Sequence, residues 1–503
     1  MELKNKKILV VGLGVLGGGV ASVKWFLEQG ADVTVTDLRS RATLKNSVKE
    51  LEGFGKTLAR PNSTMPRHSA VTFVFGRHCA EDFRGADLIV IGGGVKIIGN
   101  KFLAVAKKKK IPIVNDLTLF LENVKNPVAA ITGTRGKTTT ANWTAHFLKA
   151  KYPVARASGN SSDDALLKLL PRLAKDKTLP AVLELSSFQL EILDARLDNS
   201  SELSSGWHTP DIAVITNLSR DHLNRHGTMR NYALAKANIF KNQTKKQALI
   251  LNYDDLWTRF FLSQKPRGRV CGLSLEKRPP TKRFLIRANK KIVFGDGKGE
   301  RVVLSGRVVE KIEKLGEHNI YNFLASALTA HLLGISWKEI EKRAKTLPQI
   351  SLREEVILKR KNLTVVNDSA GTSPEATIAG IRRFTEKGKI ILITGGTDKN
   401  LEFHELAGEI KKDILPGNLF LLNGSATQKL VAELKKTRYF RGAKPQIFES
   451  LKEILISVRK TLNVEYYTPT TVLFSPGSAS FEKFRNEFDR GEKFGKYTKQ
   501  LFC

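Results

Sequence analysis

The sequence has no apolar run of the roughly 18 to 20 residues that a membrane-spanning helix needs. It also has only three cysteines, Cys79, Cys271 and Cys503, which lie far apart and form no C-x-x-C pair. These absences argue against a membrane span, a disulfide framework and a cysteine-rich metal site. We therefore expect a protein of the reducing cytoplasm without a membrane span.

Acidic residues are scarce, because 49 Asp and Glu stand against 83 Lys and Arg, which gives a formal net charge of +34. Such a charge is found in nucleic-acid binders. The longest basic run, however, is only the four lysines at 107–110, and no basic stretch with interleaved aromatic residues stands out. We therefore predict small polyanionic substrates such as nucleotides, and no nucleic acid as the main partner.

The 503 residues are too many for one hydrophobic core and indicate about three domains. Apolar strand-like runs alternate with helical segments throughout, so each domain is expected to be of the α/β class. The predicted architecture is a Rossmann-like N-terminal sheet, a central ATPase domain of the P-loop type and a Rossmann-like C-terminal domain. The predicted boundaries are 1–125, 126–347 and 348–503.

The stretch "VVGLGVLGGG" follows an apolar strand-like run near the N-terminus. Gly12, Gly14 and Gly17 fit the pattern G-x-G-x-x-G, and Asp37 lies 20 residues after Gly17. This is the fingerprint of a strand–turn–helix unit that holds a diphosphate on the helix N-terminus. Taken alone, it allows an NAD-dependent oxidoreductase.

A second glycine loop, "TGTRGKTTT", spans residues 132–140. It reads G-x-x-G-K-T from Gly133, which is shorter than the usual phosphate loop, because Ile131 stands where that loop has its first glycine. Its glycines let the backbone approach phosphate oxygens, Lys137 supplies a cation, and the hydroxyl of Thr138 can join a magnesium shell. A dehydrogenase has no use for this second loop.

Polar residues follow several of the predicted strands. Glu184 opens "ELSSFQLE", His222 lies in "NLSRDHLNRHG", and Lys236 lies in the apolar helical stretch "ALAKANIF". Further along stand "GEHNIYN", "NDSAGTSPEA", "TGGTDKN" and "SPGSASFEKFRNEFDRG". Taken together and in this order, these motifs resemble the Mur ligase family of ATP-dependent amide-bond-forming enzymes, and the resemblance covers essentially the whole chain.

The resemblance implies a ligase that activates the carboxylate of a UDP-linked muramoyl substrate with ATP. "ELSSFQLE" is similar to the branch that adds D-glutamate to UDP-N-acetylmuramoyl-L-alanine. The alternatives are a Mur-type ligase with another acidic acceptor, such as L-glutamate, and an NAD-dependent oxidoreductase. The resemblance further implies a cytoplasmic enzyme of peptidoglycan synthesis, expected to be a monomer, with ATP and two Mg²⁺ sites.

By the same resemblance, each ligand has its own residues. Catalysis is assigned to Lys137, Glu184, His222 and Lys236, with Lys236 carbamylated. The expected ATP-binding residues are Gly133, Thr134, Arg135, Gly136, Lys137, Thr138, Thr139, Asn319, Asn322, Arg353 and Asp368. The UDP-substrate residues are Gly14, Asp37, Arg39, Gly94, Asn160, Ser186 and Gln189. D-glutamate is assigned to Thr372, Lys399 and Ser480, and the metal to Thr138, Glu184, His222 and Lys236.

The chain departs from the family pattern at three places. Residues 92–95 read "GGGV", without the proline often found there. Ala370 stands where a lysine often follows "DS", so Lys399 becomes the candidate cation for the acceptor carboxylate. Glu487 falls where some members carry an aromatic residue, which leaves Ser480 as the best-matched residue of that stretch.

Overall fold

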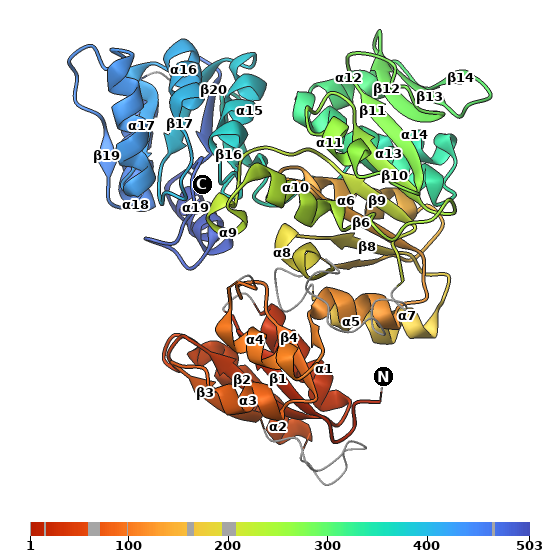
Figure 1. The fold of residues 1–503 in the computed structure, drawn as a ribbon. Helices are drawn as coiled ribbons and strands as arrows, with labels where there is room; N and C mark the ends of the chain where they lie inside the picture. The colour runs from red at the N-terminus through yellow and green to blue at the C-terminus, as the bar shows by residue number, and fades with distance from the viewer. Residues whose placement is uncertain are drawn as a thin grey trace. The chain divides into compact units, whose positions relative to one another are not determined.

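The computed structural model describes residues 2–14, 17–58, 71–97, 99–157, 165–193, 208–464 and 468–502. In this part of the chain the strands form three sheets, each flanked by helices, which confirms the predicted α/β class (Figure 1). No helix within the described ranges is long and apolar enough to cross a bilayer.

The first sheet is entirely parallel and has the strand order β3-β2-β1-β4-β5. This is the order expected of a Rossmann-like unit, with ligand sites beyond the carboxyl ends of the strands. Its strands are β1 (Lys7–Val11), β2 (Asp32–Asp37), β3 (Val71–Phe75), β4 (Leu88–Ile91) and β5 (Ile113–Val114). Its helices are α1 (Gly18–Glu28), α2 (Lys45–Leu58), α3 (Ala80–Gly85), α4 (Lys101–Lys108) and α5 (Asp116–Asn123).

The second sheet has the order β14-β13-β12-β11-β10-β9-β6-β8-β7, and only its β12–β13 and β13–β14 pairs are antiparallel. The stretch at 265–310 supplies the strands β11 to β14 at one edge. The strands are β6 (Val128–Thr132), β7 (Ala155–Ala157), β8 (Ala181–Glu184), β9 (Ile212–Ile215), β10 (Ala248–Asn252), β11 (Arg269–Ser274), β12 (Arg283–Ala288), β13 (Lys291–Gly295) and β14 (Glu300–Leu304).

Helices surround this second sheet (Figure 1). The α-helices are α6 (Lys137–Leu148), α7 (Leu170–Lys175), α8 (Ser187–Leu190), α9 (Leu223–His226), α10 (Met229–Ala237), α11 (Thr258–Ser263), α12 (Arg307–Glu313), α13 (Glu317–Leu332) and α14 (Trp337–Ala344). Short 3₁₀ turns form η1 (Leu166–Leu169) and η2 (Glu191–Leu193).

The third sheet has the order β15-β16-β20-β17-β18-β19, and β15 alone pairs antiparallel with its neighbour. Its strands are β15 (Glu355–Lys359), β16 (Leu363–Asn367), β17 (Lys389–Thr394), β18 (Leu419–Leu422), β19 (Ile447–Phe448) and β20 (Thr470–Phe474). Its helices are α15 (Pro374–Thr385), α16 (His404–Asp413), η3 (Pro416–Asn418), α17 (Ser425–Lys436), α18 (Leu451–Val464) and α19 (Glu487–Phe502).

Strand β17 shows why these parallel strands are apolar along their whole length. Ile390 and Leu392 pack into one buried cluster with α15 and α16, whereas Ile391 and Ile393 pack into another with α18 and α19. Because both faces of the sheet are covered by helices, alternate residues all meet apolar neighbours. The carboxyl ends of the strands are then left to carry polar loops.

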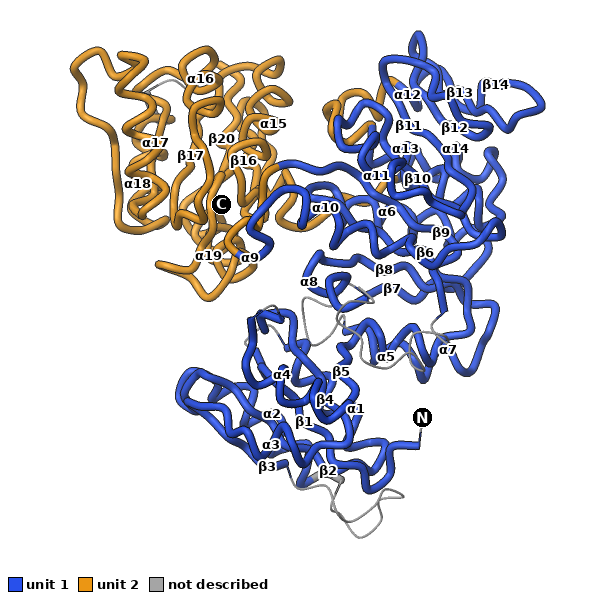
Figure 2. Tube along the Cα trace, in the orientation of Figure 1, with its two compact units in different colours: residues 1–219, 225–309, 321–346 blue, residues 220–224, 310–320, 347–503 orange. Residues whose placement is uncertain are grey.

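The chain divides by compactness into two units, shown in Figure 2. Unit 1 comprises residues 1–219, 225–309 and 321–346, and unit 2 comprises residues 220–224, 310–320 and 347–503. The first two sheets both lie in unit 1 and share one cluster of buried side chains. The predicted boundary at residues 125 and 126 lies inside this unit, and all three predicted domain ranges stay predictions.

Candidate active site

The glycine loop of residues 133–136 connects β6 to α6. Gly133 has a φ of 149° and Gly136 a φ of 80°, which side-chain-bearing residues rarely adopt. A Cβ at Gly133 would lie 1.9 Å from Oγ1 of Thr216, and one at Gly136 would lie 2.1 Å from Oδ1 of Asn322. Only glycine fits at these two positions, so the glycines allow the loop to pack closely against Thr216 and Asn322.

Two residues after β9 hold this loop in place. The N–H of Arg135 donates to Oδ1 of Asn217 at 2.9 Å, and Nδ2 of Asn217 donates to the Arg135 carbonyl at 3.2 Å. Oγ1 of Thr216 donates to the same carbonyl at 2.6 Å. The N–H of Thr134 donates to the Asn217 carbonyl at 3.0 Å. The loop therefore has its shape before any ligand arrives.

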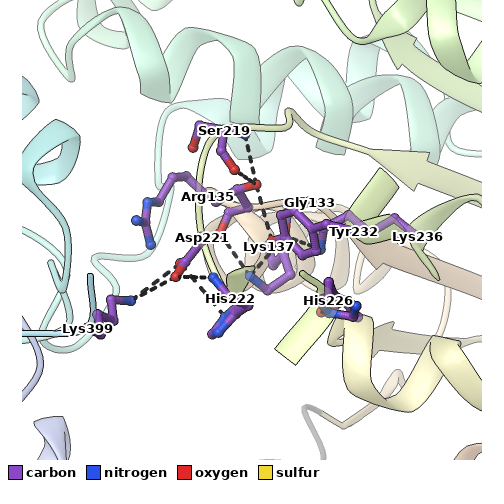
Figure 3. Close-up of polar contacts among 12 residues, drawn as sticks. Gly133, Arg135, Lys137, Ser219, Asp221, His222, His226, Tyr232, Lys236 and Lys399 are labelled. Atoms are coloured by element: carbon purple, nitrogen blue, oxygen red, sulfur yellow. Dashed lines mark hydrogen bonds and ion pairs between the residues drawn. The ribbon is translucent and has the colours of Figure 1, made fainter. Parts of the chain in front are cut away.

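Lys137 and Thr138 begin α6 and place two functional groups at the loop. Nζ of Lys137 donates to the carbonyls of Gly133 at 3.2 Å and Thr134 at 3.1 Å (Figure 3). Oγ1 of Thr138 donates to Oε1 of Glu184 at 3.0 Å, and Glu184 is buried at the end of β8. The structure thus brings Lys137, Thr138 and Glu184 together around one loop.

Two other predicted ATP-binding residues of unit 1 are buried close to this loop. Thr139 follows in the first turn of α6 and is buried. Asn322 lies against Gly136 and accepts a hydrogen bond from Oγ1 of Thr140 at 3.3 Å. Asn319 belongs to unit 2, where its Nδ2 donates to the Leu315 carbonyl at 2.9 Å.

Lys236 lies on α10 and is buried, with only 1% of the residue exposed. Its Nζ donates to the Gly133 carbonyl at 2.8 Å and to Oγ1 of Thr132 at 3.3 Å, and it lies 4.7 Å from the ring centroid of Tyr232 (Figure 3). The small neighbours in the sequence predicted this burial. The contacts show in addition that the amine reaches the glycine loop.

His222 belongs to unit 2, and its backbone φ of 54° is unusual for a non-glycine residue. Its Nε2 lies 3.7 Å from Oδ2 of Asp221, and the same carboxylate accepts from Nζ of Lys399 at 3.1 Å. In the described ranges no group of three His, Cys, Asp or Glu side chains is placed to hold a metal ion. The predicted metal ligands Thr138, Glu184, His222 and Lys236 therefore stay a prediction.

In the first sheet, the residues predicted to bind UDP meet beyond β1 and β2. Oδ2 of Asp37 accepts from the N–H of Gly14 at 3.3 Å, and its Oδ1 lies 3.8 Å from Nε of Arg39. A Cβ on Gly94 would lie 3.9 Å from a guanidinium nitrogen of Arg39. The four residues form one polar corner, whereas Asn160 lies outside the described residues.

Arg225 supports this corner and carried no signal in the sequence. Its guanidinium donates to the carbonyls of Gly93 at 3.0 Å and Val95 at 2.8 Å, and its Nε donates to Glu191 at 2.8 Å. It therefore holds the "GGGV" loop from both sides of Gly94. This contact fixes a loop that lacks the proline often found in the family.

Ser186 and Gln189 begin α8 and bind each other as a capping box. Nε2 of Gln189 also donates to Oδ2 of Asp116 at 3.1 Å, and the Gln189 carbonyl accepts from Asn115 at 2.9 Å. Burial raises the pKa of Asp116 to about 6. Gln189, one of the predicted substrate residues, thus also connects α8 to the segment that follows β5 of the first sheet.

In unit 2, three loops meet beyond the carboxyl ends of β16, β17 and β20. The N–H of Gly477 donates to the Gly371 carbonyl at 3.0 Å, and Thr397 and Ala479 exchange two backbone hydrogen bonds at 3.0 Å. These contacts join the loops that carry the predicted acceptor residues, which are Thr372, Lys399 and Ser480.

Asp368 and Arg353, two residues predicted to bind ATP, each have other hydrogen-bond partners in unit 2. Asp368 accepts from Oγ of Ser475 at 2.7 Å and from the N–H of Glu354 at 3.2 Å, while Arg353 donates to the Ala370 carbonyl at 2.5 Å. Burial and the charge of Glu354 raise the pKa of Asp368.

Comparisons with known proteins agree with this geometry. Residues 6–115 match the family model described as "Mur ligase MurD-like, N-terminal domain", and residues 131–330 match the "Mur ligase middle domain". A UDP-N-acetylmuramoylalanine–D-glutamate ligase from Roseiflexus sp. is 34% identical over 98% of both chains. A ligase of the same name from Borreliella afzelii is 32% identical over 99% of both chains. This chain belongs to the Mur ligase family.

Solved Mur ligase structures share the fold. A pseudomurein peptide ligase type C from Methanothermus fervidus has a TM-score of 0.53 at 21% identity and covers 99% of this chain and 100% of its own. MurF from Acinetobacter baumannii has a TM-score of 0.57 at 15% identity, over 98% of this chain and 93% of its own. The chain is accordingly an ATP-dependent ligase with a Mur ligase fold.

In this Mur ligase a fully buried arginine, Arg490 on α19, holds two of the acceptor loops. Its guanidinium and Nε make five hydrogen bonds of 2.8–3.2 Å, to Oγ and the carbonyl of Ser369 and to the carbonyls of Ser478 and Ala479. Burial lowers its pKa to about 10. The sequence offered only an arginine in a charged helix start, so its role was not predicted.

His226 fills a buried site between Phe188 and Tyr232, and its Nε2 lies 3.0 Å from Oγ of Ser187. Burial is the main reason that its pKa falls to about 4, and the charges of Arg225 and Lys236 add to the effect. The folded ligase therefore holds a neutral imidazole here, as part of the packing under the site.

We expect Arg490→Met to lower the free energy of unfolding of unit 2 by about 3 kcal/mol or more, because three buried carbonyls lose their charged donor. Arg490→Lys should be intermediate. Calorimetry measures this change. The control is Arg485→Met, since that side chain is 75% exposed and its ion pair is with Asp489, four residues later in the chain. Equal stabilities of the two methionine variants would contradict the role given to Arg490.

We expect His226 to make the ligase less stable as the pH falls from about 6.5 to 4. In this window the unfolded imidazole takes up a proton that the folded one does not, which costs up to about 3 kcal/mol. The free energy of unfolding, measured by urea titration at each pH, should decrease less in His226→Gln than in the wild type as the pH is lowered. His404→Gln, at an exposed position, is the control and should keep the wild-type decrease. Identical decreases for all three proteins would refute this assignment.

Proposed function

We propose that the chain joins D-glutamate to UDP-N-acetylmuramoyl-L-alanine in peptidoglycan precursor synthesis, with conversion of ATP to ADP and phosphate. The observation that carries this proposal is the glycine loop with Lys137 at its mouth and the Thr138–Glu184 pair beside it. Relatives aligned over 98–99% of the chain are named for this reaction. The proposal includes a monomer that works in the cytoplasm.

The reaction proceeds in two steps. A carboxylate oxygen of the alanyl group attacks the γ-phosphorus of ATP, so that an acyl phosphate forms and ADP leaves. The amine of D-glutamate then attacks the acyl carbon, an amide bond forms, and phosphate and a proton leave. Negative charge collects on oxygens in both steps, so the protein must supply cations and fixed orientation.

The residues present fit ATP and magnesium. A Cβ at Gly133 or Gly136 would collide with Thr216 or Asn322, so these glycines allow the loop its close packing, and Lys137 brings a positive charge to it. The oxygens of Thr138 and Glu184 are of the kind that Mg²⁺ prefers. Bound there, magnesium would neutralise phosphate charge. Thr134, Arg135 and Thr139 contribute to the loop, and Asn319, Asn322, Arg353 and Asp368 contact ATP.

A second magnesium would be held by Glu184, His222 and a carbamylated Lys236. Free lysine cannot ligate a cation while it carries a proton. Burial and neighbouring positive charge favour the neutral amine, and Lys236 is buried near Lys137. In the modification a bond forms between Nζ and the carbon of carbon dioxide and one proton leaves, which produces an anionic oxygen ligand.

The UDP substrate and D-glutamate supply the two sides of the amide bond that forms, and each is held by its own residues. Gly14, Asp37, Arg39 and Gly94 hold the UDP portion, and their mutual contacts at the first sheet support this role. Asn160, Ser186 and Gln189 contribute to the same substrate. The hydrogen-bonded loops of unit 2 present Thr372, Lys399 and Ser480 to D-glutamate. Lys399 supplies the positive charge that Ala370 cannot.

We expect phosphate release when the protein receives ATP, magnesium, UDP-N-acetylmuramoyl-L-alanine and D-glutamate together. Lys137→Ala should lower turnover at least about 100-fold, since lost transition-state charge stabilisation typically costs about 2.7–4 kcal/mol. The exposed Lys177→Ala variant should match the wild type. Release with L-glutamate instead would show a different acidic acceptor. NAD binding by calorimetry without binding of the UDP substrate would instead favour the oxidoreductase.

Lys236→Ala should be nearly inactive, because the carbamate ligand is lost, and added formate or acetate should partly restore turnover by filling its place. Lys236→Arg should stay inactive, because a guanidinium remains charged. Turnover with and without short carboxylates measures both effects, and the exposed Lys241→Ala should need no rescue. A high-resolution structure with magnesium, nucleotide and bicarbonate that shows an unmodified Lys236 would end this proposal.

A further inference from the structure

A polar cavity lies in unit 1 at the β11–β14 edge of the second sheet. Its volume is about 280 Å³. Three strands, β9, β10 and β11 in the sheet order, separate β6 and its glycine loop from β12. The proposed ligation uses none of its residues. The cavity is lined by Arg269, Arg283, Phe294, Asp296, Arg301, His331 and Leu332.

Strand register explains why these arginines converge. Phe294 on β13 lies opposite Leu285 on β12 and Arg301 on β14, and opposed residues share a face of the sheet. Arg283 lies two residues before Leu285 and therefore shares that face.

Strand β11 adds a third arginine to the same face. Cys271 pairs with Arg283 in the parallel register, and Arg269 lies two residues before Cys271. Three neighbouring chain segments thus each contribute one guanidinium to one side of the sheet.

The charges around the cavity do not balance. Arg301 pairs with Asp296 at 3.1 Å and lies 5.0 Å from the ring centroid of Phe294. Arg269 donates to the Lys246 carbonyl at 3.1 Å. Among the described residues, no carboxylate lies within ion-pair distance of Arg269 or Arg283. Three guanidiniums and one carboxylate leave an excess of two positive charges.

His331 closes the cavity from the last turn of α13. Its Nδ1 lies 3.0 Å from the Ile335 carbonyl, and its ring stacks on Trp337 with centroids 4.3 Å apart. Burial lowers the pKa of His331, and the charges of Arg301 and Arg283 lower it further, whereas the hydrogen bond to Ile335 and the charge of Asp296 act in the opposite direction. The pKa of His331 therefore depends on the charge inside the cavity.

We propose that this arginine pocket, defined by Arg269, Arg283, Arg301 and His331, binds a compact phosphate-type oxyanion. A dianion would balance the two excess charges, and guanidinium forks match phosphate oxygens in geometry. The volume lies just below the range of roughly 300–1,000 Å³ that drug-sized ligands occupy, which suits a phosphate group better than a whole nucleotide. The site is separate from the ligation reaction.

The test follows the pKa of His331 by NMR with histidine labelled at ¹³Cε1, assigned with His331→Gln. Inorganic phosphate at constant ionic strength should raise this pKa, because a neighbouring anion favours the imidazolium. Arg269→Ala combined with Arg283→Ala should remove the shift, with phosphate affinity at least about tenfold weaker. These two arginines have no ion pair to lose, so we expect the double variant to fold and to keep its ligase turnover.

Arg278→Ala is the matched control, because Arg278 is exposed, pairs with Glu300 near the same strands and does not line the cavity. It should keep the full phosphate shift. Arg283→Lys, which retains the charge but not the fork, should bind phosphate more weakly than the wild type. An equal shift with glycerol phosphate would identify a phosphoryl group of a larger molecule as an accepted ligand.

Two results would overturn the proposal. One is a His331 pKa that phosphate does not move in the wild type. The other is an equal shift in the double variant, which would show a general ionic effect. Neither result depends on ligase activity, and loss of phosphate binding at the glycine loop in Lys137→Ala leaves this readout unchanged.

Discussion

Hydrogen bonds from the residues after β9 to the glycine loop are the constraint on which the candidate site depends. Thr216 and Asn217 form hydrogen bonds with the backbone polar groups of Arg135 and Thr134. Lys137 and Lys236 both donate to the Gly133 carbonyl. With these carbonyl oxygens bound to protein donors, the negative ends of the peptide dipoles are neutralised where phosphate would otherwise be repelled. The loop can therefore serve as an anion site without rearranging.

Two buried cations show how the fold uses the difference between arginine and lysine. Arg490 cannot lose its proton under ordinary conditions. Its five hydrogen bonds to Ser369, Ser478 and Ala479 replace those that an exposed guanidinium would make with water. Lys236 donates hydrogen bonds to Oγ1 of Thr132 and to the carbonyl of Gly133. A lysine, unlike an arginine, can become neutral and react, which the carbamylation proposed for Lys236 requires.

The sequence predicted the α/β class, the two glycine loops and the placing of polar residues at strand ends, because each of these depends on local spacing. Gly133, Lys137 and Glu184 meet as the strand order requires. Contacts between distant segments could not be read in this way. Arg490 and Ser369 are 121 residues apart, and Arg225 reaches Val95 across 130. A charged residue in a polar stretch looks the same whether it faces solvent or a carbonyl.

The common core of the first two sheets has a consequence for cooperativity. Because β1 and β8 contribute side chains to one buried cluster, neither sheet can expose its face without exposing that of the other. The two sheets should then melt together, while the third sheet, with its own buried clusters, melts independently. A protease cut near residue 125 would not release two intact pieces but would weaken the whole of unit 1. A substitution that loosens the buried cluster from either sheet should therefore lower the stability of both.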